Sequence, residues 1–197
     1  GVTAQEIGRA DKVADRQVCG RGTTHISIID GQGNMASATG SNGEGNGHMV
    51  GEFGFMLNNM LREEDLHPCG FHLWPENVRL SSMMCPTLAC CETRGLMALG
   101  TGGSNRIRSA IFQTLVRSLC QDMSPQEAVI SPRVHYESGT LNMESGFIDQ
   151  LPEELSSFKI WPDINIFYGG VHMVRKMPDG SYMGFGDPRR EGVCLLA

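Results

Sequence analysis

Residues 22–30 read Gly-Thr-Thr-His-Ile-Ser-Ile-Ile-Asp, and this stretch is the starting point for predicting the fold. Polar and apolar side chains alternate along it, which predicts a β-strand that begins at Thr23 and carries Ile26 and Ile28 on one face. A threonine at the head of a strand is ordinarily structural, because β-branched side chains suit strands. Cleavage of the Gly22–Thr23 bond would change that. The new α-amine, with a pKa of roughly 7.7–8.0, would then serve as general base for its own hydroxyl.

Composition excludes several classes of protein. The 197 residues are 40% hydrophobic and 19% charged, as in a folded globular chain, and the net charge of −6 argues against a nucleic-acid-binding surface. No apolar run reaches the ~18 residues of a membrane span, and residues 1–20 lack the apolar segment of a secretory signal. The seven cysteines form no CxxC pair, so we expect most of them to be buried as small hydrophobic residues.

No metal or cofactor site is predicted. Cys69 lies between His67 and His72, but a fourth ligand at the spacing of structural zinc is missing. The pair Gly102-Gly103 precedes a helix, where backbone N–H groups can point at a developing negative charge. A tight turn or a phosphate loop is the alternative. The Gly-Lys-Ser/Thr ending of a nucleotide loop is absent, so no nucleotide cofactor is expected.

The order of the predicted elements indicates one α+β domain, with sheet packed on sheet and helices outside. After the first strand, further strands are predicted at 35–39, 53–57, 88–91, 96–99, 134–136, 141–144, 171–175 and 181–185. Helices are predicted at 4–14, from 106 to about 120, from 125 to before Pro132, and at 151–158. The glycine-rich loop 40–51 is too long to be only a connector.

Several separated motifs together resemble the small subunit of γ-glutamyltranspeptidase, over nearly all of residues 23–189. Each is weak alone, but their order and spacing are specific. The motifs are Thr23-Thr24-His25-Ile26-Ser27 with Asp30, Leu57-Asn58-Asn59, Leu80-Ser81-Ser82-Met83 with Pro86-Thr87, Gly102-Gly103-Ser104 with Arg106-Ile107, Pro132-Arg133-Val134-His135, and Asp187-Pro188-Arg189.

The resemblance implies an N-terminal-nucleophile hydrolase fold, which is a four-layer αββα sandwich, and a precursor that cleaves itself between Gly22 and Thr23. Residues 1–22 would then be the pre-cleavage segment, at the end of the large-subunit region or in a linker, and residues 23–197 the catalytic small-subunit domain. The implied partner is the large subunit of the same precursor, and homo-oligomers of such heterodimers are compatible with this arrangement.

The resemblance also implies roles for single residues. The nucleophile falls on Thr23, and the glycines of the oxyanion hole fall on Gly102 and Gly103. At the position of the family's second threonine, beside the nucleophile's amine, this chain has Ser41, which keeps the hydroxyl.

The substrate-binding residues match the family less closely. Ser81 and Ser82 match the serine pair that binds the substrate carboxylate, although from the residues alone they indicate a strand edge. The family's asparagine beside the nucleophile is replaced by glycine, and Asn42 is the adjacent amide. Glu63 is the best match for the acid that binds the substrate amine, but the charged run 63–65 is also typical of a solvated loop.

We therefore expect an autoprocessed N-terminal threonine hydrolase or acyltransferase that acts on γ-glutamyl amides of the glutathione type through an acyl-enzyme. A second hypothesis is an amidase of the same fold with another acyl specificity, such as a β-lactam side chain or a poly-glutamate. A third is a family member without turnover that acts as a binding or scaffold protein. Whether the Gly22–Thr23 bond is cut separates the processed enzyme from an unprocessed binding protein.

Overall fold

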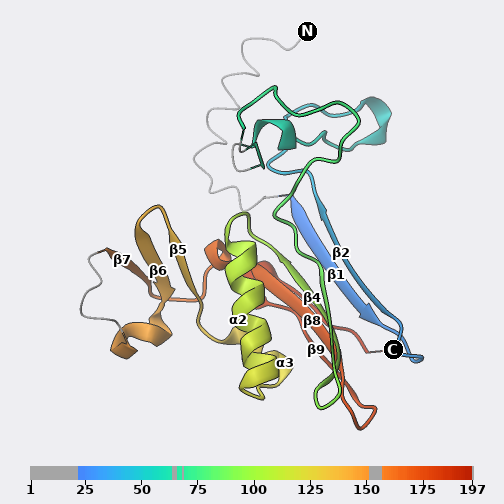
Figure 1. Cartoon of the computed structure of the whole chain (residues 1–197), viewed down its shortest axis with the longest axis vertical. Coiled ribbons are helices and arrows are strands. Elements are labelled where there is room, and N and C mark those ends of the chain that lie inside the picture. The colour runs from blue at the N-terminus through green and yellow to red at the C-terminus, as the bar shows by residue number, and fades with distance from the viewer. Residues whose placement is uncertain (1–21, 64–65, 68, 151–156, 197) are drawn as a thin grey trace.

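The computed structural model describes residues 22–63, 66–67, 69–150 and 157–196 (Figure 1). The helix predicted at 4–14 and most of the one predicted at 151–158 lie outside these residues. Among the described residues, every helix is too short or too polar to cross a bilayer.

A four-stranded antiparallel sheet forms the centre of the fold, in the order β3-β4-β8-β9. The strands are β3 (Thr87–Cys91), β4 (Gly95–Gly102), β8 (Gly170–Lys176) and β9 (Tyr182–Phe185). Helices α2 (Arg106–Cys120) and α3 (Pro125–Ile130) cover one face of this sheet (Figure 1). The core between them contains Met97, Leu99, Ile107, Ala110, Ile111, Val129, Val171 and Met173.

The predicted first hairpin covers the opposite face of the sheet. Strands β1 (Thr23–Ile29) and β2 (Met35–Ser41) pair from Thr23↔Ser41 to Ile29↔Met35, so the second strand is two residues longer than predicted. His25 faces the sheet and lies so close to Gly100 that a Cβ there would be 2.2 Å from the imidazole. Ile26 and Ile28 face outward and are 58% and 50% exposed. The described residues thus form helix, sheet and hairpin layers.

The third sheet has the order β5-β6-β7 and lies to one side of α2 (Figure 1). Strands β5 (Val134–Glu137) and β6 (Thr140–Glu144) form the predicted hairpin. Strand β7 (Phe158–Trp161) pairs in parallel with β6, so the prediction of helix at Phe158 was wrong. The backbone of 158–161 is recruited by the edge of β6, and Trp161 stacks on Phe167 with ring centroids 4.8 Å apart. Tertiary pairing of this kind overrides local helical periodicity.

The strand predicted at 53–57 was also wrong. The 3₁₀ helix η1 (Gly51–Phe53) occupies its start, and Gly54 follows with φ of +68°. The only strand-like pairing described in this loop is an isolated bridge between Met49 and Met56. Left-handed glycines turn the backbone too often for a continuous strand, so the apolar run is not extended.

Strand β4 is four residues longer than the strand predicted at 96–99, because its pairing with β8 continues to Gly102. Most other boundaries match the predictions. Helix α3 begins with the predicted capping box, because Glu127 N–H donates to Ser124 Oγ at 3.3 Å and Ser124 N–H donates to the Glu127 carboxylate at 2.9 Å. The expectation of buried cysteines was wrong for the described ones. Cys69, Cys85, Cys90 and Cys120 are exposed, and Cys91 and Cys194 are half-buried. They occupy loops, a helix end and the edge strand β3, outside the core.

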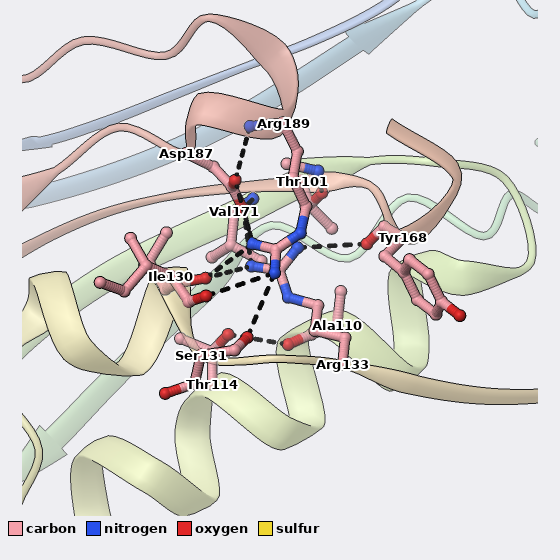
Figure 2. Close-up of polar contacts among 12 residues, drawn as sticks. Thr101, Ala110, Thr114, Ile130, Ser131, Arg133, Tyr168, Val171, Asp187 and Arg189 are labelled. Atoms are coloured by element: carbon pink, nitrogen blue, oxygen red, sulfur yellow. Dashed lines mark hydrogen bonds and ion pairs between the residues drawn. The ribbon is translucent and has the colours of Figure 1, made fainter. Parts of the chain in front are cut away.

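Two arginines and two carboxylates are buried where α3, β6 and the start of β8 meet. Figure 2 shows three of them, Arg133, Asp187 and Arg189. Arg133 donates to Asp187 Oδ2 at 2.6 Å, and Arg189 donates to Glu144 Oε1 at 2.8 Å. Asp187 Oδ2 also accepts the backbone N–H of Val171 at 3.0 Å. This charge cluster (Arg133, Glu144, Asp187 and Arg189) fixes the 3₁₀ helix η6 (Pro188–Arg190) against β8, beside the site described next.

Candidate active site

The hairpin register places Thr23 opposite Ser41 at the open end of β1 and β2. Their hydroxyl oxygens, Thr23 Oγ1 and Ser41 Oγ, are 2.7 Å apart, and Ser41 Oγ also accepts the N–H of Gly43 at 3.0 Å. Since Ser41 already accepts one hydrogen bond, it is oriented to exchange a proton with Thr23. The structure therefore brings the predicted nucleophile and the predicted second hydroxyl together.

The peptide bond before Thr23 is held on both sides. Gly22 N–H donates to Gly43 O at 3.0 Å, and the Gly22 carbonyl accepts the N–H of Asn42 at 3.0 Å. A Cβ at position 22 would lie 1.5 Å from Asn42 Oδ1, so a larger residue there would displace the Asn42 side chain. Attack on a carbonyl moves negative charge onto its oxygen, and a fixed N–H donor stabilises that charge.

The glycine pair at the end of β4 lies directly beside the nucleophile. A Cβ added at Gly102 would be 3.0 Å from Thr23 Cβ. Gly103 has φ of +144°, and a Cβ there would lie 2.9 Å from the Cα of Gly169. The pair thus allows two close backbone approaches at one point.

Two backbone N–H groups, one within this pair and one directly after it, make no hydrogen bond in the described structure. The N–H groups of Gly103 and Ser104 donate to no acceptor among the described residues. The carbonyls of the same two residues accept from Arg106 and Ile107 in the first turn of α2, at 3.1 Å each. Ser104 has φ of +54°, an uncommon conformation for a residue with a side chain, which indicates a functional or strained turn. Sequence reasoning singled out Gly102 and Gly103 and did not give Ser104 a role.

A cavity of about 280 Å³ opens beside Thr23. Of the predicted site residues, Thr23, Ser41, Glu63 and Ser82 line it. Asn42, Ser81, Gly102 and Gly103 are not among its lining residues. Its other walls are Gly43, Glu44, Asn59, Met60, Leu66, Met83, Met84, Ser104 and Ile107.

Two side-chain oxygens converge on one wall of this cavity. A Cβ at Gly43 would lie 2.1 Å from Asn59 Oδ1 and 2.2 Å from Glu63 Oε1. The glycine that departs from the family pattern is therefore the residue that gives these two groups room. A carboxylate beside an amide oxygen suits an ammonium group of a substrate.

The interface between hairpin and sheet is polar near the site. His25 Nδ1 and Nε2 lie 2.7 Å from Thr39 Oγ1 and from Ser27 Oγ. Burial, helped by the charge of His172, lowers the pKa of His25 to about 4. His25 is therefore neutral at pH 7 and fixes the two strands. Arg190, which sequence reasoning missed, donates from Nη1 to the carbonyl of Thr23 at 3.4 Å.

No group of three His, Cys, Asp or Glu side chains in the described part of the chain is placed to hold a metal ion. The described site offers the Thr23 hydroxyl, the neighbouring Ser41 hydroxyl and oriented backbone amides.

Comparison with known proteins adds independent information. Acylase ACY 1 proenzyme from Pseudomonas sp. (strain SE83) is 32% identical over 175 residues, which are 87% of this chain and 31% of that protein. Glutathione hydrolase proenzyme from Escherichia coli (strain K12) is 26% identical over 181 residues, with 85% of this chain and 31% of that protein covered. This chain thus spans about a third of the length of these relatives.

Comparison with solved structures finds a similar fold. A solved γ-glutamyltranspeptidase from Pseudomonas nitroreducens, complexed with L-DON, superposes with a TM-score of 0.71 at 23% identity. The match covers 88% of this chain and 99% of that one. A family model described as gamma-glutamyltranspeptidase matches residues 4–197. With the threonine at the head of β1 and the glycine pair beside it, this chain belongs to the γ-glutamyltranspeptidase family.

Proposed function

We propose that this chain carries the catalytic centre of a self-processing N-terminal threonine hydrolase or acyltransferase that acts on γ-glutamyl amides. The observation that carries the proposal is the placement of Thr23. Its hydroxyl is 2.7 Å from Ser41 Oγ, its preceding carbonyl is hydrogen-bonded, and a cavity opens beside it.

Self-processing starts from the intact Gly22–Thr23 bond. Thr23 Oγ1 attacks the Gly22 carbonyl carbon and passes its proton toward Ser41, while the N–H of Asn42 stabilises the oxyanion. Collapse breaks the C–N bond, so the amine of Thr23 takes up a proton and Gly22 is held as an ester. Water then hydrolyses this ester. The products are a carboxylate on Gly22 and a free α-amine on Thr23.

The same hydroxyl then serves the substrate. The α-amine accepts the proton of Thr23 Oγ1 as the oxygen attacks the amide carbonyl of the substrate. The segment Gly102–Ser104 offers backbone amides to the oxyanion. The N–H of Gly103 makes no hydrogen bond in the described structure, and it directly follows Gly102, which lies against Thr23. The leaving amine departs with the proton. Water or a second amine takes the acyl group from the ester.

The residues that line the cavity support a proposal for the acyl specificity. Glu63 with Asn59 suits the α-ammonium of a γ-glutamyl group, and Ser81 with Ser82 is proposed to bind its carboxylate. The lining also includes the apolar residues Met60, Leu66, Met83, Met84 and Ile107. These apolar residues favour a second candidate, an acylase for a less polar acyl chain. One of the relatives is named an acylase and another a glutathione hydrolase.

We further propose that the large subunit of the same precursor completes the fold. Ile26 and Ile28 expose apolar surface on the outer face of the hairpin, where an αββα sandwich has its second helical layer. Residues 1–22 would be the pre-cleavage segment and 23–197 the catalytic domain. The relatives are proenzymes about three times as long as the matched region, which supports a two-subunit product.

Intact-mass measurement and anilide turnover test this function together. The proposal expects chains split between Gly22 and Thr23, release of p-nitroaniline from L-γ-glutamyl-p-nitroanilide, and an added acyl mass on the Thr23 chain. An adipyl anilide in the same assay tests the acylase candidate. A chain that is not split and turns over neither anilide would contradict both enzymatic proposals and favour a binding protein without turnover.

Replacement of Gly103 by valine is expected to lower turnover by about 10²–10³, the usual cost of one lost oxyanion donor. The Cβ would meet the Gly169 backbone and force the 102–104 segment to move. Anilide kinetics on purified, split protein measure the effect. Gly139→Ala is the matched control, because Gly139 also has a positive φ, of +79°, but lies in the β5–β6 turn with open space around it. Equal turnover in Gly103→Val and wild type would show that the 102–104 segment does not stabilise the oxyanion.

Replacement of Glu63 by glutamine is expected to raise KM for a substrate with a free α-amine and to leave an N-acylated analogue nearly unchanged. Loss of one partner of a charge pair weakens binding, by about tenfold or more when the pair is desolvated. The two substrates are compared on wild type and variant. Glu52→Gln is a control from η1, in the same loop but outside the cavity lining. Parallel changes with both substrates would take α-amine recognition away from Glu63.

A further inference from the structure

Thr101 is a buried threonine one residue before the glycine pair, and its hydroxyl makes two backbone hydrogen bonds. Thr101 Oγ1 donates to the carbonyl of Gly102 at 2.7 Å and accepts the N–H of Gly170 at 2.9 Å. Only 1% of Thr101 is exposed. One hydroxyl hydrogen and one lone pair are thus both used, which fixes the rotation of this group.

The two faces of β4 show on which side of the sheet the Thr101 side chain lies. Gly100 and Gly102 face the hairpin, since Cβ atoms there would meet His25 and Thr23. Leu99 lies in the core under α2, on the other face. Because side chains alternate along a strand, Thr101 belongs to the helix-facing side, away from Thr23.

The geometry of the peptide bond transmits this orientation. The described residues contain no cis peptide bond, so the carbonyl of Gly102 and the N–H of Gly103 point in opposite directions. The Thr101 hydroxyl holds the carbonyl of Gly102 beside Gly169. The N–H of Gly103 therefore points away from Thr101 and Gly169.

We propose that Thr101 is a positioning residue for acyl transfer: its hydroxyl locks the Gly102–Gly103 peptide so that the Gly103 amide donates to the oxyanion. This inference rests on the proposed function. The first turn of α2 fixes the next peptide in the same way, because the Gly103 carbonyl accepts the N–H of Arg106 at 3.1 Å. Thr101 supplies the equivalent anchor where no helix is available.

The surrounding glycines make this anchor possible. A Cβ at Gly169 would lie 2.6 Å from the Gly102 carbonyl oxygen and 2.9 Å from Thr101 Oγ1. Gly102 itself pairs with Gly170 in the β4–β8 ladder. Without the hydroxyl, the Gly102 carbonyl loses this hydrogen bond, and any rotation of the Gly102–Gly103 peptide moves the Gly103 N–H with it.

The test compares Thr101→Val and Thr101→Ser with a matched buried threonine. Thr114 is also fully buried, and its hydroxyl donates to the Ala110 carbonyl at 2.9 Å inside α2 (Figure 2). Turnover of L-γ-glutamyl-p-nitroanilide is measured on split protein and normalised to active sites counted from the acylation burst. Thr101→Val is expected to lower kcat by about 10- to 100-fold with KM within about twofold, because a donor used only in the transition state is misaligned. Thr101→Ser restores kcat, and Thr114→Val leaves it within about twofold of wild type.

Each outcome decides between the proposals. Unchanged kcat in Thr101→Val, an equal loss in Thr101→Ser, or an equal loss in Thr114→Val would overturn the positioning role while the proposed function stands. A wild-type protein that neither splits nor releases p-nitroaniline would overturn the function instead. If Thr101→Val does not accumulate as folded protein, Thr101→Ala is measured in its place against the same serine variant.

Discussion

Thr23→Ala is expected to give a single uncut chain with no detectable anilide turnover. The variant removes the hydroxyl that attacks the Gly22 carbonyl, so the ester intermediate of self-cleavage cannot form. It also removes the nucleophile of acyl transfer. In enzymes with an activated hydroxyl nucleophile, such a loss costs on the order of 10⁶ in turnover. Intact mass and p-nitroaniline release measure the two effects separately.

The neighbouring threonine offers a matched control. Thr24 faces outward from the hairpin and is exposed, while Thr23 faces the cavity. Thr24→Ala should split and turn over as the wild type does. Thr23→Ser keeps a hydroxyl 2.7 Å from Ser41 and should still split, at a changed rate. Cleavage of purified Thr23→Ala without added protease would show that this bond is cut by another agent.

Strands and helices were predictable from the sequence where a short run of consecutive residues determines them. The period of β1, the stripe of α2 and the Ser124–Glu127 capping box each follow from a few consecutive residues, and each is confirmed. Strand β7 was missed because its identity depends on the edge of β6, which no local pattern records. The apolar run 53–57 was assigned as a strand because its hydrophobicity was weighed without the conformations of Gly51 and Gly54.

The candidate site was predictable in its chemistry and less so in its geometry. The family resemblance pointed to Thr23, Ser41 and the glycine pair, and these residues lie close together in the structure. The roles of Thr101 and Arg190 depend on hydrogen bonds between segments far apart in sequence. A buried threonine beside two glycines carries no sequence signal of its own, because threonine is common in strands.

Asp187→Asn is expected to be the most destabilising single substitution in the described fold. Arg133 and Asp187 are both fully buried and joined at 2.6 Å, and Arg189 N–H donates to the same carboxylate at 2.9 Å. Burial lowers the pKa of Arg133 to about 10, so the guanidinium stays charged at pH 7. The amide would leave one buried positive charge without its counterion. Breaking a buried pair in this way costs about 3–5 kcal/mol, against the roughly 5–15 kcal/mol that stabilises a domain.

Urea unfolding of split wild type and variant measures this cost, and two further variants show its origin. Asp179→Asn is the control, because Asp179 is an exposed carboxylate in the β8–β9 turn whose partner is the nearby Ser181. It should change the free energy of unfolding by no more than about 1 kcal/mol. The double variant Arg133→Met, Asp187→Asn removes the unpaired charge together with its partner, and it should be more stable than Asp187→Asn alone. If adding Arg133→Met lowers stability further, the cluster acts through the backbone bonds of Asp187, such as the one from Val171 N–H, and not through its charges.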